Sequence, residues 1–169
     1  MKKLITKEQL HARNIEIAKE ISNIYGDEEL TCIVLLRGAF FFGSDLCKLL
    51  NNIKIDFLIS TSYEGQKSKT NLGYNLISDI REDIVGKNVL IIEDIIDSGD
   101  SMIDTINIIR LKKPKSITVV SCLKRKKMIK FIPSDHFIYG FEVGEGFLVG
   151  YGLDHNQKQR ELEDIYTIE

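Results

Sequence analysis

Three carboxylates and a turn of small residues lie close together in the middle of the chain. Glu93 and Asp94 directly follow the apolar run 89–92, and Asp97 precedes the small residues of segment 98–101. A turn of small residues at the start of a helix can present backbone N–H groups and the positive end of the helix dipole to a phosphate. Carboxylates can bind sugar hydroxyls or a magnesium ion that carries further phosphates. The pattern therefore predicts a site for a phosphorylated sugar.

An apolar strand that ends in acidic residues also occurs where nothing binds, so the surrounding elements must support this hypothesis. A capping box from Thr6 to Gln9 predicts a first helix, which Gly26 ends. Apolar runs and amphipathic stretches then alternate along the chain. They predict strands at 31–36, 55–59, 74–80, 88–92, 116–123, 137–143 and 147–151, and helices at 39–50 and 101–111.

This alternation predicts an α/β fold, with a twisted, mainly parallel sheet flanked by helices. Ligands of such sheets bind beyond the carboxyl ends of the strands. Polar residues of several segments are expected at those ends: Arg37, Gly38, Ser62, Tyr63, Glu93 to Ser101, and Lys124. This convergence supports a binding site more strongly than the acidic motif does alone.

The composition is that of an ordinary globular protein, and 169 residues predict a single domain over 1–169. The formal net charge of −2 gives no electrostatic case for a nucleic-acid or membrane partner. The sequence has no apolar run of membrane-spanning length and no recognisable signal peptide. Its three cysteines are widely spaced, as is typical of buried, reduced thiols, which predicts a cytoplasmic location.

The segment from Glu93 to Gly99 resembles the phosphoribosyl pyrophosphate signature of the type I phosphoribosyltransferases, in the form of the hypoxanthine-guanine branch. The resemblance involves five segments between about residues 33 and 162. It implies the type I phosphoribosyltransferase fold, with a small hood formed mainly by about 128–169 and the N-terminal segment. It also implies a Mg²⁺-dependent purine salvage enzyme, which transfers a 5-phosphoribosyl group to hypoxanthine, guanine or both and releases pyrophosphate.

The resemblance assigns the acidic motif to the sugar and its phosphate. Glu93 and Asp94 match residues that bind ribose hydroxyls and magnesium. Asp97 matches the catalytic residue that handles the proton at purine N7. The loop that binds the 5′-phosphate corresponds to Ser98, Gly99, Asp100 and Ser101.

Other segments match the pyrophosphate site and a lid. Leu35 to Leu46 resembles the family's pyrophosphate loop, in which the dipeptide matching Arg37–Gly38 can adopt a cis bond. Arg160 matches an arginine that reaches pyrophosphate. Ser62 and Tyr63 resemble the start of a lid that closes during catalysis and excludes water.

The C-terminal part matches the purine site. Lys124 matches the lysine that bonds the 6-oxo group, whereas the adjacent Lys126 and Lys127 are expected to be exposed. Phe147 matches the ring that stacks on the base, although an isolated aromatic residue more often belongs to a core. Leu148 matches the residue whose backbone reads the base edge. Asp154 matches a residue of a second magnesium site.

Two features depart from the family pattern. Asp100 lies inside the phosphate loop, where a carboxylate that pointed inward would repel phosphate, so we expect it to point outward. The stretch Val143 to Gly146 replaces the family's usual Ile-Pro before the stacking ring, which leaves the base preference open.

Two other functions share part of this pattern. A regulatory protein of the same fold would bind the phosphoribosyl group without catalysis, but the near-neutral charge and the complete purine hood argue against it. A signalling receiver domain would carry its acidic pair after the first strand, whereas here about three strands precede Glu93. We therefore predict an enzyme of small-molecule substrates, phosphoribosyl pyrophosphate and a 6-oxopurine, that assembles as a homodimer or homotetramer.

Overall fold

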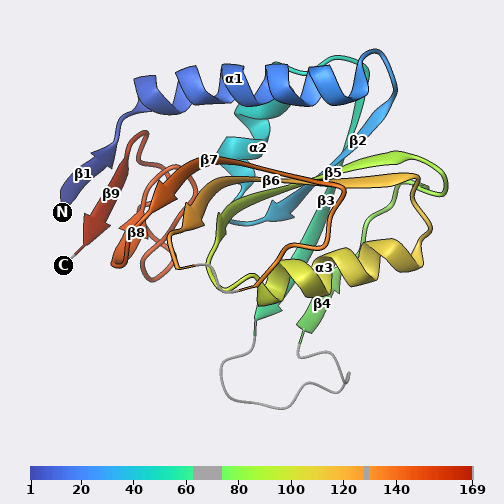
Figure 1. Cartoon of the computed structure of the whole chain (residues 1–169). Helices are drawn as coiled ribbons and strands as arrows, with labels where there is room; N and C mark the ends of the chain where they lie inside the picture. Colours follow the sequence, from blue (N-terminus) through green and yellow to red (C-terminus); the bar gives the residue numbers. More distant parts are fainter. Residues whose placement is uncertain (63–73, 128–129, 169) are drawn as a thin grey trace.

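The computed structural model describes residues 1–62, 74–127 and 130–168 and has a central sheet between two layers of helices (Figure 1). The sheet has the order β4-β3-β2-β5-β6-β7. β4 runs antiparallel to β3, and the other neighbouring pairs are parallel. The strands are β2 (Leu30–Leu36), β3 (Ile53–Ser62), β4 (Tyr74–Ser78), β5 (Asn88–Ile96), β6 (Ser116–Arg125) and β7 (His136–Val143). The predicted mainly parallel α/β fold is confirmed.

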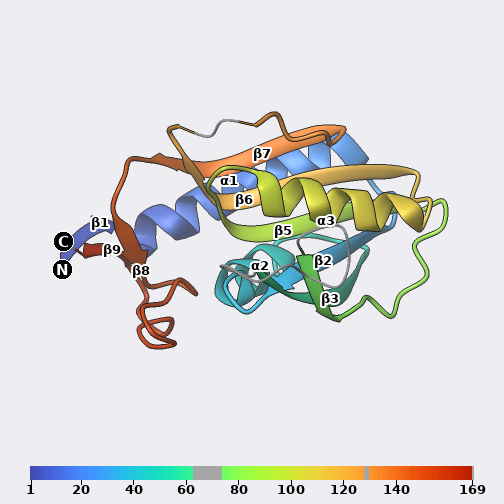
Figure 2. The same ribbon diagram turned by 90° about the horizontal axis from the view of Figure 1, so that it is seen from below.

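Helices α1 (Lys7–Tyr25) and α2 (Phe40–Cys47) cover one face of the sheet, and α3 (Asp100–Leu111) covers the other (Figures 1 and 2). The predicted capping box is present, because the Thr6 hydroxyl accepts from the Gln9 backbone and the Gln9 side chain accepts from the Thr6 backbone. Gly26 ends α1 with a φ of 58°, a conformation that glycine adopts without steric cost.

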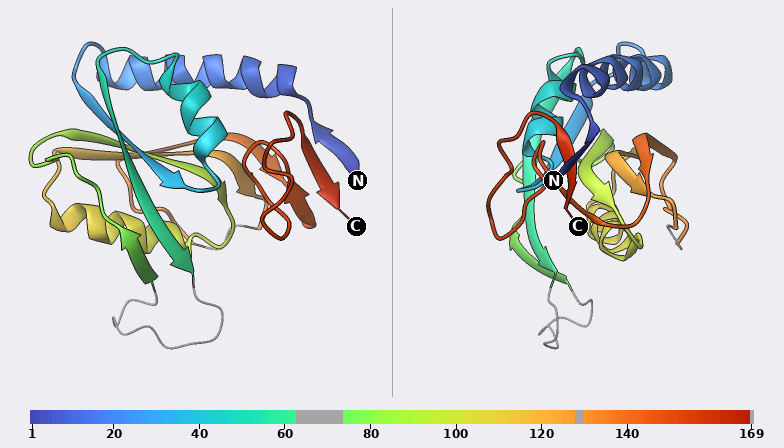
Figure 3. Two further views of the ribbon diagram at one scale, coloured as in Figure 1. Left: turned by 180° about the vertical axis from the view of Figure 1, so that it is seen from behind. Right: turned by 90° about the vertical axis from the view of Figure 1, so that its left-hand side faces the viewer.

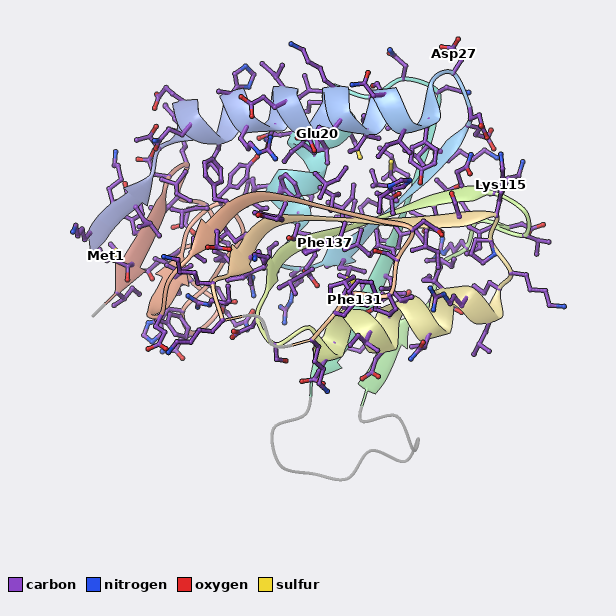
Figure 4. The ribbon with its side chains drawn as sticks, in the orientation of Figure 1. Met1, Glu20, Asp27, Lys115, Phe131 and Phe137 are labelled. Atoms are coloured by element: carbon purple, nitrogen blue, oxygen red, sulfur yellow. The ribbon has the colours of Figure 1, made fainter. Side chains whose placement is uncertain are left out.

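Strand alternation divides the apolar side chains into two cores. Leu90 and Ile92 of β5 pack with α1 and α2, whereas Val89 and Ile91 pack with α3. Side chains fill both spaces between helices and sheet (Figure 4). Burying one such aliphatic side chain contributes about 1.5–3 kcal/mol, so these two cores fix the orientation of β5.

A second sheet lies at one end of the molecule and joins the two termini (Figure 3). Its strands are β1 (Lys2–Ile5), β8 (Phe147–Val149) and β9 (Ile165–Ile168), all antiparallel in the order β1-β9-β8. The predicted hood included the N-terminal segment and about 128–169. Within that range, β7 belongs to the central sheet, and the small sheet takes its strands from residue 147 onward.

The middle strand is longer than its sequence pattern predicts. β5 does not end at Ile92, because its pairing with β6 continues to Ile96 opposite Lys124. Glu93 and Asp94 therefore lie within the strand, and α3 begins four residues after Ile96, at Asp100. None of the helices in the described part of the chain combines the length and hydropathy that crossing a bilayer requires.

Candidate active site

β5 directs its two adjacent carboxylates to opposite faces of the sheet. Glu93 lines a small cavity with Ser101 and Met102, on the side of α3. Asp94 points to the other side, where its carboxylate lies against Gly38. The side-chain period of two in a strand produces this separation. The two carboxyl groups diverge from adjacent residues but still interact with each other at the end of the sheet.

Both carboxyl groups are partly buried, and each accepts a bond from the next backbone N–H: Asp94 N to Glu93 Oε1 at 2.9 Å and Ile95 N to Asp94 Oδ1 at 2.7 Å. Burial, followed by repulsion from Asp94, raises the pKa of Glu93 well above its usual range. Burial also raises the pKa of Asp94, although the charge of Arg160 opposes that shift. A cation beside this pair would relieve both desolvation and repulsion.

The connection from β5 to α3 surrounds a cavity of about 150 Å³. Gly99 precedes α3, has a φ of 92° and has no side chain that could cap the helix. The first helical amide, Asp100 N, donates to the Ser98 hydroxyl at 3.3 Å. The cavity is lined by Glu93, Ile95, Ile96, Asp97, Ser98, Gly99, Ser101 and Met102. Its position at a helix N-terminus suits a phosphate group.

Asp100 is ion-paired outside this cavity. Its carboxylate bonds the ammonium group of Lys130 and accepts from the Ser98 hydroxyl at 2.7 Å. The Lys130 bond lowers the pKa of Asp100 below its usual value. Asp100 does not line the cavity, as expected for a carboxylate beside a phosphate loop.

The connection from β2 to α2 meets Asp94 at close range. A Cβ atom on Gly38 would lie 1.8 Å from Asp94 Oδ2, so the carboxylate occupies space that only glycine leaves free. The cis peptide bond in this connection joins Leu36 to Arg37. The expected cis bond between Arg37 and Gly38 was therefore placed one residue too late.

The segment between β8 and β9 folds back onto the same connection (Figure 3). Gly152 has a φ of 103°, and a Cβ atom there would lie 1.9 Å from the carbonyl oxygen of Gly38. Arg160 donates to the Gly152 carbonyl at 2.6 Å and pairs with Asp154 at 2.6 Å. The structure thus brings together Gly38, Asp94, Asp154 and Arg160, which come from three distant segments.

Lys124 ends β6 and is paired with its neighbouring strand. Its Nζ lies 2.8 Å from Glu142 Oε2 and 4.9 Å from the centre of the Tyr139 ring. The Glu142 bond raises the pKa of Lys124, which keeps the side chain a cation. An ammonium group has three donors, so pairing with Glu142 leaves hydrogens for another acceptor.

Phe147 begins β8 and is 52% exposed, although it is a large apolar residue. Its ring and that of His155 form a T-shaped contact, with the centroids 5.3 Å apart. The next residue, Leu148, is buried and pairs with Thr167 of β9. An exposed ring held on a buried strand is suited to stacking on a flat ligand.

Asp97 lies at the junction of two cavities. It lines the small cavity beside Gly99 and also a larger one of about 770 Å³, and its side chain is 79% exposed. The larger cavity is lined by Asp97, Arg125, Lys126, Lys127, Gly144, Glu145 and Gly146. A ligand with a phosphate at one end and a flat ring at the other could extend across Asp97.

Comparisons with known proteins identify the family. The sequence pattern of the phosphoribosyl transferase domain matches residues 4–156. The chain belongs to the phosphoribosyl transferase family. It is 35% identical to a hypoxanthine phosphoribosyltransferase of Escherichia coli K12, over 96% of this chain and 92% of that protein. It is 36% identical to a hypoxanthine-guanine phosphoribosyltransferase of Aquifex aeolicus, over 100% of this chain and 95% of that protein.

Superposition on solved structures supports the same family. A crystal structure of a hypoxanthine-guanine phosphoribosyltransferase of Bacillus anthracis superposes with a TM-score of 0.91 at 33% identity, covering 100% of this chain and 99% of that chain. The resemblance to the hypoxanthine-guanine branch, and with it the type I phosphoribosyltransferase fold, is confirmed.

The carboxylates of this phosphoribosyl transferase suit a cation shared with a substrate. Among the described residues, no group of three or more His, Cys, Asp or Glu side chains is close enough to bind a metal alone. Mg²⁺ is commonly bound by one or two carboxylates together with substrate phosphates. The crowded, partly buried pair Glu93 and Asp94 provides such a partial site.

Several residues around the site were not predicted from the sequence. Arg125, Lys130, Glu142 and Gly152 each contact a predicted site residue or its loop. Lys126 and Lys127 are exposed, as expected. Of the predicted lid residues, Ser62 ends β3 but its side chain lies outside the described residues, as does all of Tyr63.

Proposed function

We propose that this phosphoribosyl transferase converts phosphoribosyl pyrophosphate and hypoxanthine or guanine into the nucleoside monophosphate and pyrophosphate. The observation that carries the proposal is the position of Asp97 between the two cavities. A 5′-phosphate in the small cavity and a purine in the large one would put the new glycosidic bond beside this carboxylate. The similarity to hypoxanthine and hypoxanthine-guanine phosphoribosyltransferases supports the choice of base.

In this proposal, the backbone from Ser98 to Ser101 binds the 5′-phosphate. Arg37, Gly38 and Arg160 bind pyrophosphate, a role that the contact between Gly38 and the Arg160-bound Gly152 supports. Asp97 accepts or shares the proton at purine N7 as the bond to N9 forms. A carboxylate placed at the reacting group typically contributes about 10²–10⁴-fold as a general base.

Lys124 and Phe147 directly adjoin Arg125 and Gly146, two residues that line the larger cavity. In this proposal they recognise the base together with Leu148. Lys124 donates to the 6-oxo group with a hydrogen that Glu142 does not take. The half-exposed ring of Phe147 stacks on the purine, and the Leu148 backbone reads its edge. Adenine carries an amino donor in place of the oxygen, so its entry would leave Lys124 facing a donor.

Glu93 and Asp94 would hold the magnesium ion on which the reaction depends, and Asp154 would contribute to a second ion. When bound, Mg²⁺ offsets the negative charge of pyrophosphate. The raised pKa of Glu93 supports this assignment, because it marks a carboxylate that a cation would stabilise in its charged form.

The test is turnover of hypoxanthine, guanine, xanthine and adenine under identical conditions. We expect turnover of hypoxanthine or guanine, with adenine at least about two orders of magnitude slower, as for a mismatched polar pair. Comparable rates with adenine would refute the role of Lys124. If no base turned over while phosphoribosyl pyrophosphate still bound, the chain would be a regulatory protein of the same fold.

We also propose that the chain forms a homodimer or homotetramer and works in the cytoplasm. An apolar groove of about 320 Å³ runs between α2 and β3, beside the exposed rings of Phe40 and Phe57. Exposed apolar surface of this kind often marks a contact between subunits. The free, buried cysteines suit a reducing compartment. Analytical ultracentrifugation would test the assembly, and a monomer at micromolar concentration would contradict it.

A further inference from the structure

Arg125 connects three parts of the site that the sequence keeps apart. It is the last residue of β6, and its side chain is only 17% exposed. Its guanidinium group donates from Nη1 to the carbonyl of Gly144 and from Nη2 to the carbonyl of Gly146 at 2.8 Å. Its Nε lies 3.8 Å from Asp97 Oδ1. One side chain therefore spans the β7–β8 turn and the carboxylate between the two cavities.

The β7–β8 turn has little rigidity of its own. It comprises Gly144, Glu145 and Gly146, and Gly146 has a φ of 115°. A Cβ atom on Gly144 would meet nothing within 4 Å, so neighbouring side chains do not confine this part of the turn. Glycine has the largest conformational freedom of any residue, so a turn of this composition needs outside contacts to hold one conformation.

The β6–β7 ladder, Arg125 and an exposed ion pair between Lys127 and Glu145 supply those contacts. Val143 pairs with Arg125 at the end of the two strands, and its carbonyl accepts from Lys126 N at 2.9 Å. The planar guanidinium then reaches beyond the ladder and bonds two carbonyls of the turn at once, a geometry that the compact ammonium of lysine cannot reproduce. Phe147 follows the second of these carbonyls directly, so the position of its ring depends on the turn.

We infer that Arg125 is a positioning residue that fixes the β7–β8 turn and thereby the purine-stacking ring of Phe147. This inference rests on the proposed function for the identity of the base. Its effect on the reaction is exerted through Phe147 and the wall of the larger cavity. Phosphoribosyl pyrophosphate, bound at the other cavity and at the Gly38 connection, does not depend on this turn.

The chain offers a matched control in Arg13. From α1, Arg13 donates to the carbonyls of Gly140 at 3.1 Å and Tyr139 at 2.8 Å, so it too bonds two backbone carbonyls, here in β7, the strand that leads into the turn. It belongs to α1, and its bonds reach β7 before the turn begins. Arg13→Gln and Arg125→Gln therefore each remove one positive charge and two bonds to backbone carbonyls, from β7 and from the turn respectively. Arg13→Gln also removes ion pairs with Glu16 and Glu20, so its effect on stability is an upper bound for the comparison.

The experiment measures both Michaelis constants and amide hydrogen exchange for wild type, Arg125→Gln, Arg125→Lys and Arg13→Gln. For Arg125→Gln we expect faster exchange of the turn amides and a purine KM raised roughly tenfold or more, the loss typical of hydrogen bonds to a charged group. The KM of phosphoribosyl pyrophosphate should stay within about twofold. Arg125→Lys retains a cation near Asp97 but loses the planar group that bonds both turn carbonyls. It should therefore raise the purine KM as much as Arg125→Gln does, while its kcat stays closer to that of wild type.

Arg13→Gln should lower Tm without changing either KM or the exchange of the turn. The inference is overturned if turn exchange is unchanged in Arg125→Gln, if both Michaelis constants rise together, or if Arg125→Lys binds purine like wild type. Failure of Arg125→Lys to fold would also overturn it, since the residue would then be structural. If wild type turned over no 6-oxopurine, the proposed function would fail, whereas hydrogen exchange would still decide whether Arg125 holds the turn.

Discussion

The β5–α3 connection and the β7–β8 turn border the same residue, Asp97, but they are ordered in different ways. The β5–α3 connection is continuous in sequence, and its conformation follows from a strand end, the left-handed Gly99 and a helix start. The β7–β8 turn has two glycines and is held by Arg125, which lies 19 residues earlier. The conformation of the β5–α3 connection follows from its own residues, whereas that of the β7–β8 turn depends on a distant side chain.

This difference separates two kinds of recognition. A phosphate is bound by backbone N–H groups and a helix dipole, which a short local motif can supply completely. A flat base needs a ring and a wall at a defined spacing, which requires elements that are distant in sequence. Substitutions in the local region should therefore affect chemistry and phosphoribosyl pyrophosphate, whereas those around the turn should affect the base.

The largest expected effect is at Asp97, where the two regions meet. Asp97→Asn retains the shape and hydrogen-bonding capacity of the side chain but cannot accept a proton. We expect kcat to fall by roughly 10²–10⁴-fold. Binding of phosphoribosyl pyrophosphate should change little, because Glu93, Asp94 and the loop remain. Single-turnover rates and a binding titration measure the two quantities, and a variant that lost affinity alone would make Asp97 a binding residue.

A smaller effect is expected at Gly38. This residue of the β2–α2 connection lies against Asp94 of β5 and against Gly152, which is distant in sequence. In Gly38→Ala the new methyl group would collide with Asp94 Oδ2, the flexible end of a side chain, so the carboxylate must move. We expect the KM of phosphoribosyl pyrophosphate to rise about 10–100-fold, as for loss of a charged hydrogen-bonding group, with Tm nearly unchanged. Steady-state kinetics and thermal denaturation measure both.

Gly152→Ala provides the contrast. Its methyl group would meet the Gly38 backbone carbonyl, and its φ of 103° disfavours alanine, so both Tm and activity should fall. An equal decrease of Tm in Gly38→Ala and Gly152→Ala would show that movement of Asp94 does not relieve the contact at Gly38.

The fold and the acidic motif could be predicted because both depend on patterns of residues that are close together in the sequence. The alternation of apolar strands and helices gave the parallel sheet, and the contiguous run from Glu93 to Gly99 carries the prediction of a phosphate loop. The extent of β5 was not predictable, because acidic residues usually end a strand and only the pairing with β6 carries this one to Ile96.

The partners of the site were hidden for a related reason. Arg125 belongs to a run of four basic residues, which alone resembles an exposed surface, and its role depends on Gly144 and Gly146. Lys130 and Asp100 are 30 residues apart. Such pairs are defined by the folded chain, so spacing in the sequence gives no signal for them.

The charged carboxylate of Glu93 is expected to lower the free energy of unfolding in the absence of a metal ion. Its carboxyl pKa is raised in the folded state, so the folded chain holds this proton at pH values where the unfolded chain releases it. Stability from this group is greatest below the unfolded pKa of about 4.3 and is lost as pH rises through the folded pKa. In metal-free buffer, Glu93→Gln should therefore raise Tm by about 2–4 °C at pH 8, the effect of ~1 kcal/mol in a chain of this size, and by less at pH 5.

Asp100→Asn is the control of opposite sign from the same connection. The pKa of Asp100 is lowered by Lys130, so its contribution is present above the unfolded pKa and is lost as pH falls through the folded one. This variant should lower Tm slightly at pH 8 and less at low pH. A Glu93→Gln variant that was less stable than wild type at pH 8 would show that the charged Glu93 carboxylate does not destabilise the folded chain.

The smallest effect on binding is expected at Lys130. Its ammonium group pairs with Asp100, the carboxylate next to the predicted phosphate loop that does not line the cavity. Lys130→Ala should weaken phosphoribosyl pyrophosphate binding about two- to fivefold, the usual scale of an exposed ion pair. Lys130→Ala combined with Asp100→Asn should restore it, because the uncompensated charge is then gone. A binding titration of the four proteins measures this cycle, and additive losses would argue against charge compensation.

In the proposed function, Asp97 lies between one cavity that takes the phosphate and another that takes the purine. A crystal structure of the chain with its product nucleotide tests this most directly. We predict the 5′-phosphate in the cavity at Gly99, the base in the cavity beside Phe147 and Arg125, and the bond between sugar and base next to the Asp97 carboxylate. A nucleotide that lay within one cavity, or whose glycosidic bond was out of reach of Asp97, would contradict the account.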